Sequence, residues 1–578
     1  MLSLTNKKWC LANQPAETVS LLQQELKIPD VVAKLLVSRE VTSKDSAQNF
    51  LDPSLSRLHD PFLMQGMREA VDRVILALEQ KESITVFCDY DVDGVTSAAF
   101  LTHFFRDLNC NVDAYLPERK LEGYGLNTAA VRKIREKGAG LMITADCGIT
   151  GVKEVALANE IGLDVIITDH HQVGEEGLPM AIAVLNPHRA DCEYPYKFLS
   201  GVGLAFKLAI GVRNGLYSTG WAKDNLPNLK QHLDLFALGT IADVAPLTGE
   251  NHILTLHGLK MLATSAKPGL VALKETAGIV GNVDSRSVGF GLGPRLNAAG
   301  RLGKADSGLH LLISTDLKEA KTLAQELELT NKERKEIQEE TLEEAESLFR
   351  SLIDIQKDRV IVLASEVFHP GVIGIAASKL VDKYHRPTVL IALEEGEGKG
   401  SGRSTPKFNL FRAFTDCGKH LVQFGGHAYA AGLTIKEDKV EEFRQAMNEV
   451  GHQFLKDEDL IPEVRLDTLL TLDEINEYLY RRMELLEPFG AENPVPCFLS
   501  RAVQLQEVKL IGKDKTHVRF RARQGKGRIE GVGFGLAVAL ESVDVAIERF
   551  DIVYELNLNT WNGREKLEIK LIDIRLCS

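Results

Sequence analysis

Short apolar runs that end in acidic residues constrain the fold of this chain more than any other feature. Three runs have this form, namely Ile84–Cys88 before Asp89, Leu141–Ala145 before Asp146, and Asp164–Thr168 before Asp169. The segments between them, such as Ala129–Lys137 and Val152–Ile161, have the apolar spacing of helices. Alternating strands and helices predict an α/β fold with a doubly wound parallel sheet. The carboxyl ends of parallel strands share one edge, so we expect the acidic residues to meet there.

The acidic residues themselves suggest a metal site. Asp89-Tyr-Asp91-Val-Asp93 resembles the start of a calcium-binding EF-hand loop, but that loop needs a glutamate at position 12, which is Phe100 here, and a preceding helix. Taken alone, each motif could be a solvated turn or a helix N-cap. We expect Asp243 at a further strand end, and the aspartates gathered at this edge would repel one another unless a cation binds. His170 lies in the same set of strand ends and offers a ring nitrogen to such a cation. Aspartate with imidazole favours Mn²⁺ or Mg²⁺ over zinc.

Changes in the spacing of apolar residues along the chain indicate where its domains begin and end. We predict an N-terminal lead segment (1–60), a catalytic domain (61–314), a bridging helix (315–357), a second α/β domain (358–456) and a C-terminal β-barrel of the OB-fold type (457–578). The centre of the bridging segment, Asn331–Glu336, is polar all round, which is typical of a helix solvated between two domains. A coiled-coil dimer is the alternative, but the apolar seam is interrupted, and we expect a monomer.

Composition limits the class of protein. The net charge of −13 does not indicate a nucleic-acid binder, although a phosphate-binding groove needs only a local basic surface. The eight cysteines form no C-x-x-C pair, which argues against a zinc finger or a disulfide framework. No apolar run approaches the roughly 18 residues that span a bilayer. We therefore expect a cytoplasmic protein without a membrane partner.

The order of the motifs resembles that of the DHH phosphoesterases: Asp-x-Asp, an isolated Asp, Asp-His-His and a further Asp. The resemblance covers nearly the whole chain and implies two Mn²⁺ or Mg²⁺ ions per active site. The implied metal ligands are Asp91, Asp93, Asp146, His170 and Asp243, with Asp146 bridging the metals and Asp89 as an additional ligand or supporting group. By the same resemblance, His171 contacts substrate or assists the leaving group, and Asp169 orients a histidine.

A second set of residues suggests the substrate. Ser401-Gly-Arg403-Ser404 and Gly425-Gly426-His427 resemble the DHHA1 substrate-binding domain, and Arg119, Arg295, Asn297 and Arg301 lie in segments similar to those of DHH enzymes that digest single-stranded DNA from the 5′ end. The resemblance implies that these arginines bind DNA phosphates and that 5′-mononucleotides are released in DNA repair and recombination. It also implies single-strand-binding protein and a helicase as partners. For each arginine alone, a surface salt bridge is the alternative.

The predicted barrel is locally basic. Nine basic residues lie between Lys509 and Arg528, with the aromatic residues Phe520, Phe534 and Trp561 nearby. OB-folds bind single strands through such charge combined with stacking, although strand alternation would place several of the aromatic rings in the barrel core. Two rival functions remain open, a DHH phosphodiesterase for short RNA or cyclic dinucleotides and a nonenzymatic DNA-binding replication scaffold. The intact aspartate–histidine set argues against the scaffold.

Overall fold

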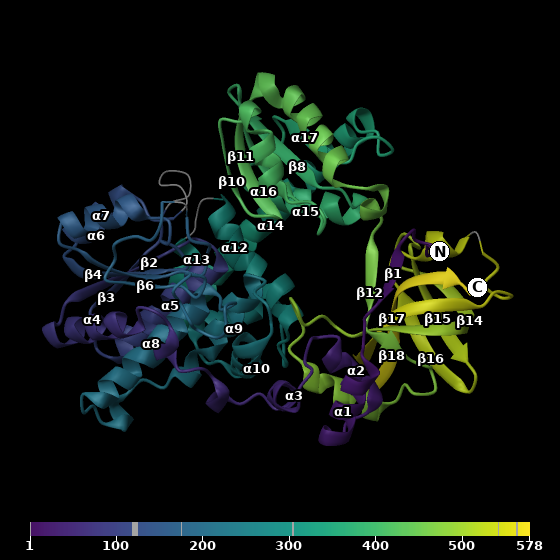
Figure 1. Ribbon diagram of the computed structural model, residues 1–578, viewed down its shortest axis with the longest axis horizontal. Coiled ribbons are helices and arrows are strands. Elements are labelled where there is room, and N and C mark those ends of the chain that lie inside the picture. Colours follow the sequence, from purple (N-terminus) through teal and green to yellow (C-terminus); the bar gives the residue numbers. More distant parts are fainter. Residues whose placement is uncertain are drawn as a thin grey trace.

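The computed structural model describes residues 2–117, 125–174, 176–302, 306–541, 543–561 and 564–577, and Figure 1 shows that they form three lobes. The parallel-sheet lobe lies at the left of the view, the mixed-sheet lobe at the top and the barrel lobe at the right. Helix α14 (Leu317–Leu352) joins the first two lobes. Among the described residues, no helix combines the length and apolar character needed to cross a membrane.

The parallel-sheet lobe has the predicted doubly wound architecture. Its five strands run parallel in the order β3-β2-β4-β5-β6. Their bounds are β2 Ser83–Cys88, β3 Val112–Tyr115, β4 Ala139–Ala145, β5 Asp164–Thr168 and β6 Ala183–Leu185. The helices are α4 Met67–Gln80, α5 Val92–Asp107, α6 Thr128–Glu136, α7 Val152–Glu160, α8 Gly201–Ser218, α9 Leu233–Ala242, α10 Gly249–Thr264, α11 Pro268–Thr276, α12 Gly293–Leu302 and α13 Asp306–Ile313. The apolar strands β2, β4 and β5 are buried because helices cover both faces of the sheet.

Helix α14 (Leu317–Leu352) confirms the predicted long helix but not its exposure. The expectation of a centre solvated on every side is wrong, because Asn331 is 1% exposed and Arg334 is 8% exposed. The guanidinium of Arg334 donates to the side chains of Asn331 and Gln338 at 2.7 and 2.6 Å. One polar face of the helix, formed by Asn331, Arg334 and Gln338, is thus buried, and its side chains form hydrogen bonds with one another within the helix.

The mixed-sheet lobe contains a five-stranded sheet in the order β10-β11-β9-β8-β7, in which only β7 and β8 are parallel. The strands are β7 Ile361–Ser365, β8 Thr388–Glu394, β9 Glu397–Arg403, β10 Gln423–Gly426 and β11 Ala430–Lys436. The helices are α15 Ile373–Tyr384, α16 Leu410–Asp416 and α17 Val440–Phe454. Apolar side chains from both faces of the sheet pack against these helices and α14.

The barrel lobe closes because β14 pairs with both β15 and β17. Its strands are β12 Glu463–Leu466, β13 Thr468–Leu469, β14 Cys497–Ile511, β15 His517–Gln524, β16 Gly527–Gly533, β17 Phe550–Trp561 and β18 Arg564–Leu576, with helices α18 Glu477–Met483 and α19 Ala537–Glu541. Strands β14 to β18 form the closed sheet of the predicted C-terminal barrel. The longest strand, β14, was not identified from the sequence.

The N-terminal segment folds onto the barrel rather than onto the sheet that follows it in the chain. Strand β1 (Lys8–Leu11) pairs in parallel with β12, and helices α1 (Ala16–Leu26), α2 (Asp30–Val37) and α3 (Lys44–Leu51) share one apolar core with the barrel. Trp9 Nε1 donates to Asp573 Oδ2 at 2.7 Å. Both ends of the chain therefore lie in the barrel lobe (Figure 1).

Candidate metal centre

The acidic motifs meet at one edge of the parallel sheet, as the sequence predicts. The backbone N–H of Asp89 donates to Ala145 O at 3.4 Å, that of Asp146 to Thr168 O at 2.9 Å, and that of Asp169 to Leu185 O at 3.2 Å. Each motif thus starts with a hydrogen bond to the last residue of the neighbouring strand. This continuation of the ladder aligns the side chains at a common level above the sheet.

The placement of Asp243 corrects the expectation that it follows a strand. Asp243 is the C-cap of α9, and the residue after it, Val244, has a left-handed φ of 60°. The helix nevertheless brings the Asp243 carboxylate to the same edge, with Oδ2 3.9 Å from His170 Nε2. A buried apolar helix, with Leu235, Phe236 and Leu238 in the core, thus positions a group that we expected at a strand end.

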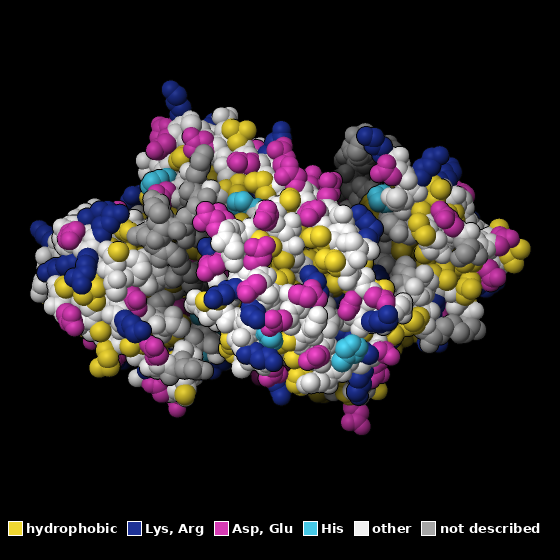
Figure 2. Space-filling model, turned by 90° about the horizontal axis from the view of Figure 1, so that it is seen from above, with side chains coloured by type: hydrophobic (Ala, Val, Ile, Leu, Met, Phe, Trp, Pro, Cys, Tyr) yellow, Lys and Arg dark blue, Asp and Glu magenta, His cyan; other side chains and the backbone are white. Residues whose placement is uncertain are grey.

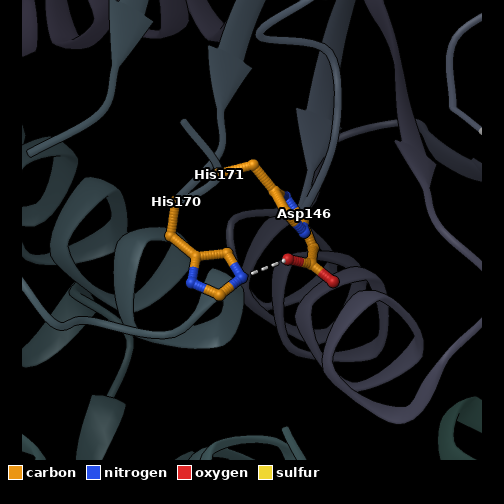
Figure 3. Close-up of side chains that lie close together, drawn as sticks. All are labelled: Asp146, His170 and His171. Atoms are coloured by element: carbon orange, nitrogen blue, oxygen red, sulfur yellow. Dashed lines mark ion pairs between the residues drawn. The ribbon is translucent and has the colours of Figure 1, made fainter. Parts of the chain in front are cut away.

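The potential ligands form three overlapping groups whose oxygen and nitrogen atoms lie within 4.8 Å of one another. The groups are Asp89–Asp91–Asp146, Asp146–His170–His171 and Asp93–His170–Asp243. Asp146 belongs to two of them, and its Oδ1 lies 3.1 Å from His170 Nε2 (Figure 3). Below, "the metal cluster" denotes the six predicted ligands Asp89, Asp91, Asp93, Asp146, His170 and Asp243.

Asp146 reaches its position through an unusual backbone. Its φ of 63° is left-handed, a conformation that aspartate tolerates better than most residues. Gly201 leaves the necessary space at the start of α8, since a Cβ there would lie 2.6 Å from Asp146 Cβ and 2.7 Å from its Oδ1. The close approach of a helix start to the central carboxylate therefore requires glycine at position 201.

Asp93 has a structural role beside its predicted metal role. Its Oδ2 accepts from Gly201 N at 2.5 Å and its Oδ1 from Val202 N at 2.9 Å. These are N–H groups of the first turn of α8, which have no partner within their own helix. Each oxygen has a second lone pair for a cation, so the two roles are compatible.

The electrostatics of the cluster favour a bound cation. Burial, followed by repulsion from Asp91, raises the pKa of Asp93 to about 7. Burial, with repulsion from neighbouring aspartates, also raises the pKa values of Asp146 and Asp243 well above the ordinary range. Such crowding of carboxylates is costly without a compensating charge. A set of aspartates with one imidazole suits a hard divalent ion such as Mn²⁺ or Mg²⁺.

The two histidines differ in protonation. Burial lowers the pKa of His170 to about 4, so its imidazole is neutral and has a lone pair for a metal. Burial by itself would lower the pKa of His171, but the hydrogen bond of 2.7 Å from its Nδ1 to Asp169 Oδ1 and the negative charges of Asp169, Asp243 and Asp91 together raise this pKa to about 9. Asp169 is held by Ile149 N at 2.8 Å and by His171 N at 3.0 Å. This geometry supports the predicted role of Asp169 in orienting a histidine.

Asn186 is a supporting residue that the sequence analysis missed. It is fully buried directly after β6, donates from Nδ2 to His171 O at 2.8 Å and accepts from His188 N at 2.7 Å. It thus holds the backbone of the Asp169–His171 loop. The available signal was a polar residue following the apolar run Ala183–Leu185, the same pattern that marks the other motifs.

The residues of the second predicted site also come together. Arg403 is the last residue of β9 and pairs with Ala430 of β11 in the ladder, and Ser404 follows directly after the strand. Ser404 N donates to Tyr429 O at 3.0 Å, and His427 N to Ala430 O at 2.8 Å. Gly426 has a φ of 135°, and a Cβ there would lie 2.5 Å from Ala430 O. Below, "the Arg403 cluster" denotes Ser401, Arg403, Ser404, Gly426 and His427.

Arg403 is a cation held by neutral groups. Its Nη1 donates to Gly402 O at 2.8 Å and to Ser401 Oγ at 3.1 Å, and no carboxylate pairs with it among the described residues. Burial lowers the pKa of its guanidinium. A desolvated guanidinium without a counter-ion is suited to a phosphate, whose oxygens match its planar fork.

The remaining predicted DNA contacts are placed differently. Arg295 forms an ion pair of 2.5 Å with Glu328 of α14, and Asn297 accepts from Val92 N, at the start of α5, at 3.2 Å. Arg301 donates to Gly371 O of the mixed-sheet lobe at 3.3 Å. Arg295 and Asn297 thus support the junction of α12, α5 and α14, whereas Arg301 links α12 to the mixed-sheet lobe. Contact of these side chains with DNA stays a prediction. Arg119 lies outside the described residues.

The basic residues of the barrel line its outer surface. Arg519, Arg521 and Arg523 alternate with the buried residues Val518, Phe520 and Ala522 along β15, so Phe520 belongs to the core, as alternation predicts. Glu530 pairs with Lys566 at 2.6 Å and with Arg519 at 3.4 Å, which neutralises part of the charge. Figure 2 likewise shows acidic and basic side chains interspersed over the visible face.

Comparison with known proteins agrees with this architecture. The chain matches family models for the DHH family N-terminal domain over residues 83–240, the DHHA1 domain over 357–452 and the RecJ OB domain over 466–573. It is 40% identical over 570 residues to the single-stranded-DNA-specific exonuclease RecJ of Bacillus subtilis, covering 98% of this chain and 70% of that protein. It is 35% identical to the RecJ of Escherichia coli, covering 95% of this chain and 96% of that protein.

A solved structure shows the same fold. The crystal structure of RecJ from Thermus thermophilus in complex with Mn²⁺ superposes with a TM-score of 0.82 at 30% identity, covering 99% of this chain and 80% of that one. A structure of the same protein with Mg²⁺ gives a TM-score of 0.77 at 29% identity, covering 99% of this chain and 79% of that one. The chain therefore belongs to the family of RecJ single-stranded-DNA-specific exonucleases.

Proposed function

We propose that this chain is a metal-dependent exonuclease that hydrolyses single-stranded DNA from the 5′ end and releases 5′-mononucleotides. The observation that carries the proposal is the presence of two complementary sites. The metal cluster gathers carboxylates and a neutral imidazole, and the Arg403 cluster offers a desolvated guanidinium that no carboxylate neutralises among the described residues. The first site suits hydrolysis of a phosphodiester, and the second suits recognition of a terminal phosphate.

The residues of the cluster divide the chemical tasks. Asp89, Asp91, Asp93, Asp146 and Asp243, with neutral His170, would hold the metals, and Asp146 would be shared between them because it belongs to two of the ligand groups. Two bound Mn²⁺ or Mg²⁺ ions supply an acidified water and neutralise the charge that develops on the phosphate. His171, kept protonated by Asp169, can donate a proton to the leaving 3′ oxygen.

Strand polarity is assigned to the Arg403 cluster rather than to the metals. Divalent ions act on whichever phosphodiester reaches them, so they distinguish the two strand ends poorly. A pocket that accepts one terminus sets which bond lies at the metals. We assign the 5′-phosphate to Arg403, with His427 and the glycine turn beside it, and we expect the strand to run between the parallel-sheet and mixed-sheet lobes.

The test is digestion of one oligonucleotide labelled at the 5′ end or at the 3′ end, with Mn²⁺ or with EDTA. We expect a labelled mononucleotide as the first product from the 5′-labelled strand, progressive shortening of the 3′-labelled strand, and no reaction in EDTA. The same sequence annealed to its complement is the control and should resist digestion. Release of a mononucleotide first from the 3′ end would contradict the assigned polarity.

The rival functions predict other results in the same assay. A phosphodiesterase for cyclic dinucleotides or very short RNA would leave a long DNA strand intact, and a replication scaffold would bind without cutting. We further propose that the protein acts as a cytoplasmic monomer. We expect a helicase to supply its single strands and single-strand-binding protein to present them, because an enzyme limited to single strands depends on unwinding.

A further inference from the structure

The start of helix α15 contacts the side chain of Arg403. Gly374 lies in the first turn of this helix and is buried. A Cβ at Gly374 would lie 2.7 Å from Arg403 Nη2 and 3.0 Å from Ser401 Oγ. Both distances are tighter than ordinary van der Waals contact, so the guanidinium occupies the space that any other side chain at position 374 would need.

The local fold does not require glycine at this position. Gly374 has a helical backbone rather than a left-handed one, and alanine is the better helix former. The atom that a Cβ would meet most closely is the end of a flexible side chain, which can move without disturbing the backbone. An alanine at position 374 is therefore compatible with the helix, and the guanidinium of Arg403 would have to move to make room for its Cβ.

The other side of the guanidinium is already fixed. Arg403 Nη1 is held by Gly402 O at 2.8 Å and by Ser401 Oγ at 3.1 Å, while Nη2 lies 2.7 Å from the position that a Cβ of residue 374 would occupy. The fork is thus wedged between the end of β9 and the start of α15. Phosphate binding by arginine depends on the orientation of this fork, because two parallel N–H groups must face two oxygens.

We propose that Gly374 is a positioning residue for recognition of the 5′-phosphate, which sets the orientation of Arg403 by leaving no side chain between the helix and the guanidinium. The inference rests on the proposed role of Arg403. Gly374 itself contacts neither the metals nor the scissile bond, so its substitution changes how a terminus is bound and leaves the chemical step intact.

The experiment compares wild type, Gly374→Ala, Arg403→Ala and the double variant on matched 5′-phosphate and 5′-hydroxyl oligonucleotides at fixed salt and Mn²⁺. We expect Gly374→Ala to raise KM for the phosphorylated strand about tenfold, the loss that follows from weakening one charge-assisted contact, with kcat within about twofold. In the Arg403→Ala background the same substitution should have no further effect, because the group that it displaces is absent.

Gly418→Ala is the matched control. Gly418 lies in the same lobe, and a Cβ there would meet Phe424 at 3.5 Å, an ordinary contact. We expect this variant to keep wild-type KM and phosphate preference. Thermal melts accompany the kinetics, and Gly374→Ala should melt no lower than wild type. If it melts lower, Arg403→Ala should restore the melting temperature by removing the contacted atoms, and failure to do so would overturn the proposed contact.

The outcomes separate this inference from the proposed function. An unchanged phosphate preference in Gly374→Ala, or equal effects of the substitution with and without Arg403, would overturn the role of Gly374 alone. An unchanged preference in Arg403→Ala would place the terminus elsewhere and would overturn both. A tenfold effect that disappears in the double variant supports the inference.

Discussion

His170 Nε2 lies 3.1 Å from Asp146 Oδ1, and the same aspartate belongs to the ligand group of Asp89 and Asp91. Asp146 thus links the ligand group of Asp89 and Asp91 to the group that contains His170. We expect Asp146→Ala to reduce turnover by more than about a hundredfold, since even groups that only support metal ligands contribute ten- to a hundredfold. The variant should also lose most of the thermal stabilisation that saturating Mn²⁺ gives, which is about 2.7 kcal/mol at a hundred times Kd.

Nuclease assays and melts in Mn²⁺ and in EDTA check this prediction. Lys379→Ala is the control, because Lys379 lies on the exposed side of α15 and its loss should leave both turnover and Mn²⁺ stabilisation as in wild type. Turnover near that of wild type in Asp146→Ala would exclude the two-metal assignment.

Asp93 and Asp91 should differ in their effect on stability. Asp93→Ala leaves two buried N–H groups of α8 without acceptors, at a cost of about 1–3 kcal/mol each. Asp91→Ala removes only the N-cap of α5, worth about 1 kcal/mol, and relieves repulsion among the carboxylates. We expect both variants to be inactive and Asp93→Ala to melt at the lower temperature in EDTA. Equal melting temperatures would remove the structural role of Asp93.

The raised pKa of Asp243 gives a pH-dependent stability. In the metal-free protein the folded state keeps the proton on this carboxyl to higher pH than the unfolded chain does. The unfolded state therefore binds fewer protons, and the contribution of Asp243 to stability falls as pH rises above about 4. Asp243→Asn removes this dependence, so in EDTA the free energy of unfolding of the variant should rise relative to that of wild type as pH increases above about 4.

Chemical denaturation of both proteins at several pH values measures that difference. In saturating Mn²⁺ we expect wild type to be more stable than Asp243→Asn, because the metal favours the ionised carboxylate and the amide is a weaker ligand. A difference that is independent of pH in EDTA would show that Asp243 is ionised without metal.

Arg403 should be replaceable only in part by lysine. Arg403→Ala should raise KM for a 5′-phosphorylated strand about ten- to a hundredfold, the range of a charge-assisted contact, and should reduce the preference over a 5′-hydroxyl end. Arg403→Lys should recover part of the loss because a point charge lacks the planar fork. Matched oligonucleotides at fixed salt give the comparison, and full recovery by lysine would argue against two-oxygen recognition.

The barrel should contribute to DNA binding through its unpaired cations. Arg523 is exposed on β15 and has no ion-pair partner among the described residues, whereas Arg481 of the same lobe pairs with Glu484 at 3.0 Å. If Arg523 contacts a phosphate, Arg523→Gln should make the salt dependence of single-strand binding shallower by about 0.7 in log–log slope. Arg481→Gln, with the same change in charge, should leave the slope nearly unchanged. Equal slopes for both variants would argue against a phosphate contact.

Local signals allowed the parallel sheet and most of the metal cluster to be predicted from the sequence. An apolar run followed by aspartate identifies a strand end by itself, and parallel pairing brings such ends together. Asp243 was misplaced because a buried helix such as α9 has the same uninterrupted apolar character as a buried strand. The burial of Arg334 and the packing of the N-terminal helices depend on contacts between distant parts of the chain. No local pattern encodes such contacts.

The pairing of β1 with β12 has a consequence for how the protein is made. Helices α1–α3 share their apolar core with strands that are synthesised after both other lobes, from Cys497 to Leu576. The parallel-sheet and mixed-sheet lobes can fold in the meantime, because the buried residues of their cores are complete by Leu455. Helices α1–α3 must wait with their apolar faces uncovered throughout this interval. Translation that stops before the barrel therefore leaves apolar surface of these helices uncovered beside two lobes whose cores are already complete.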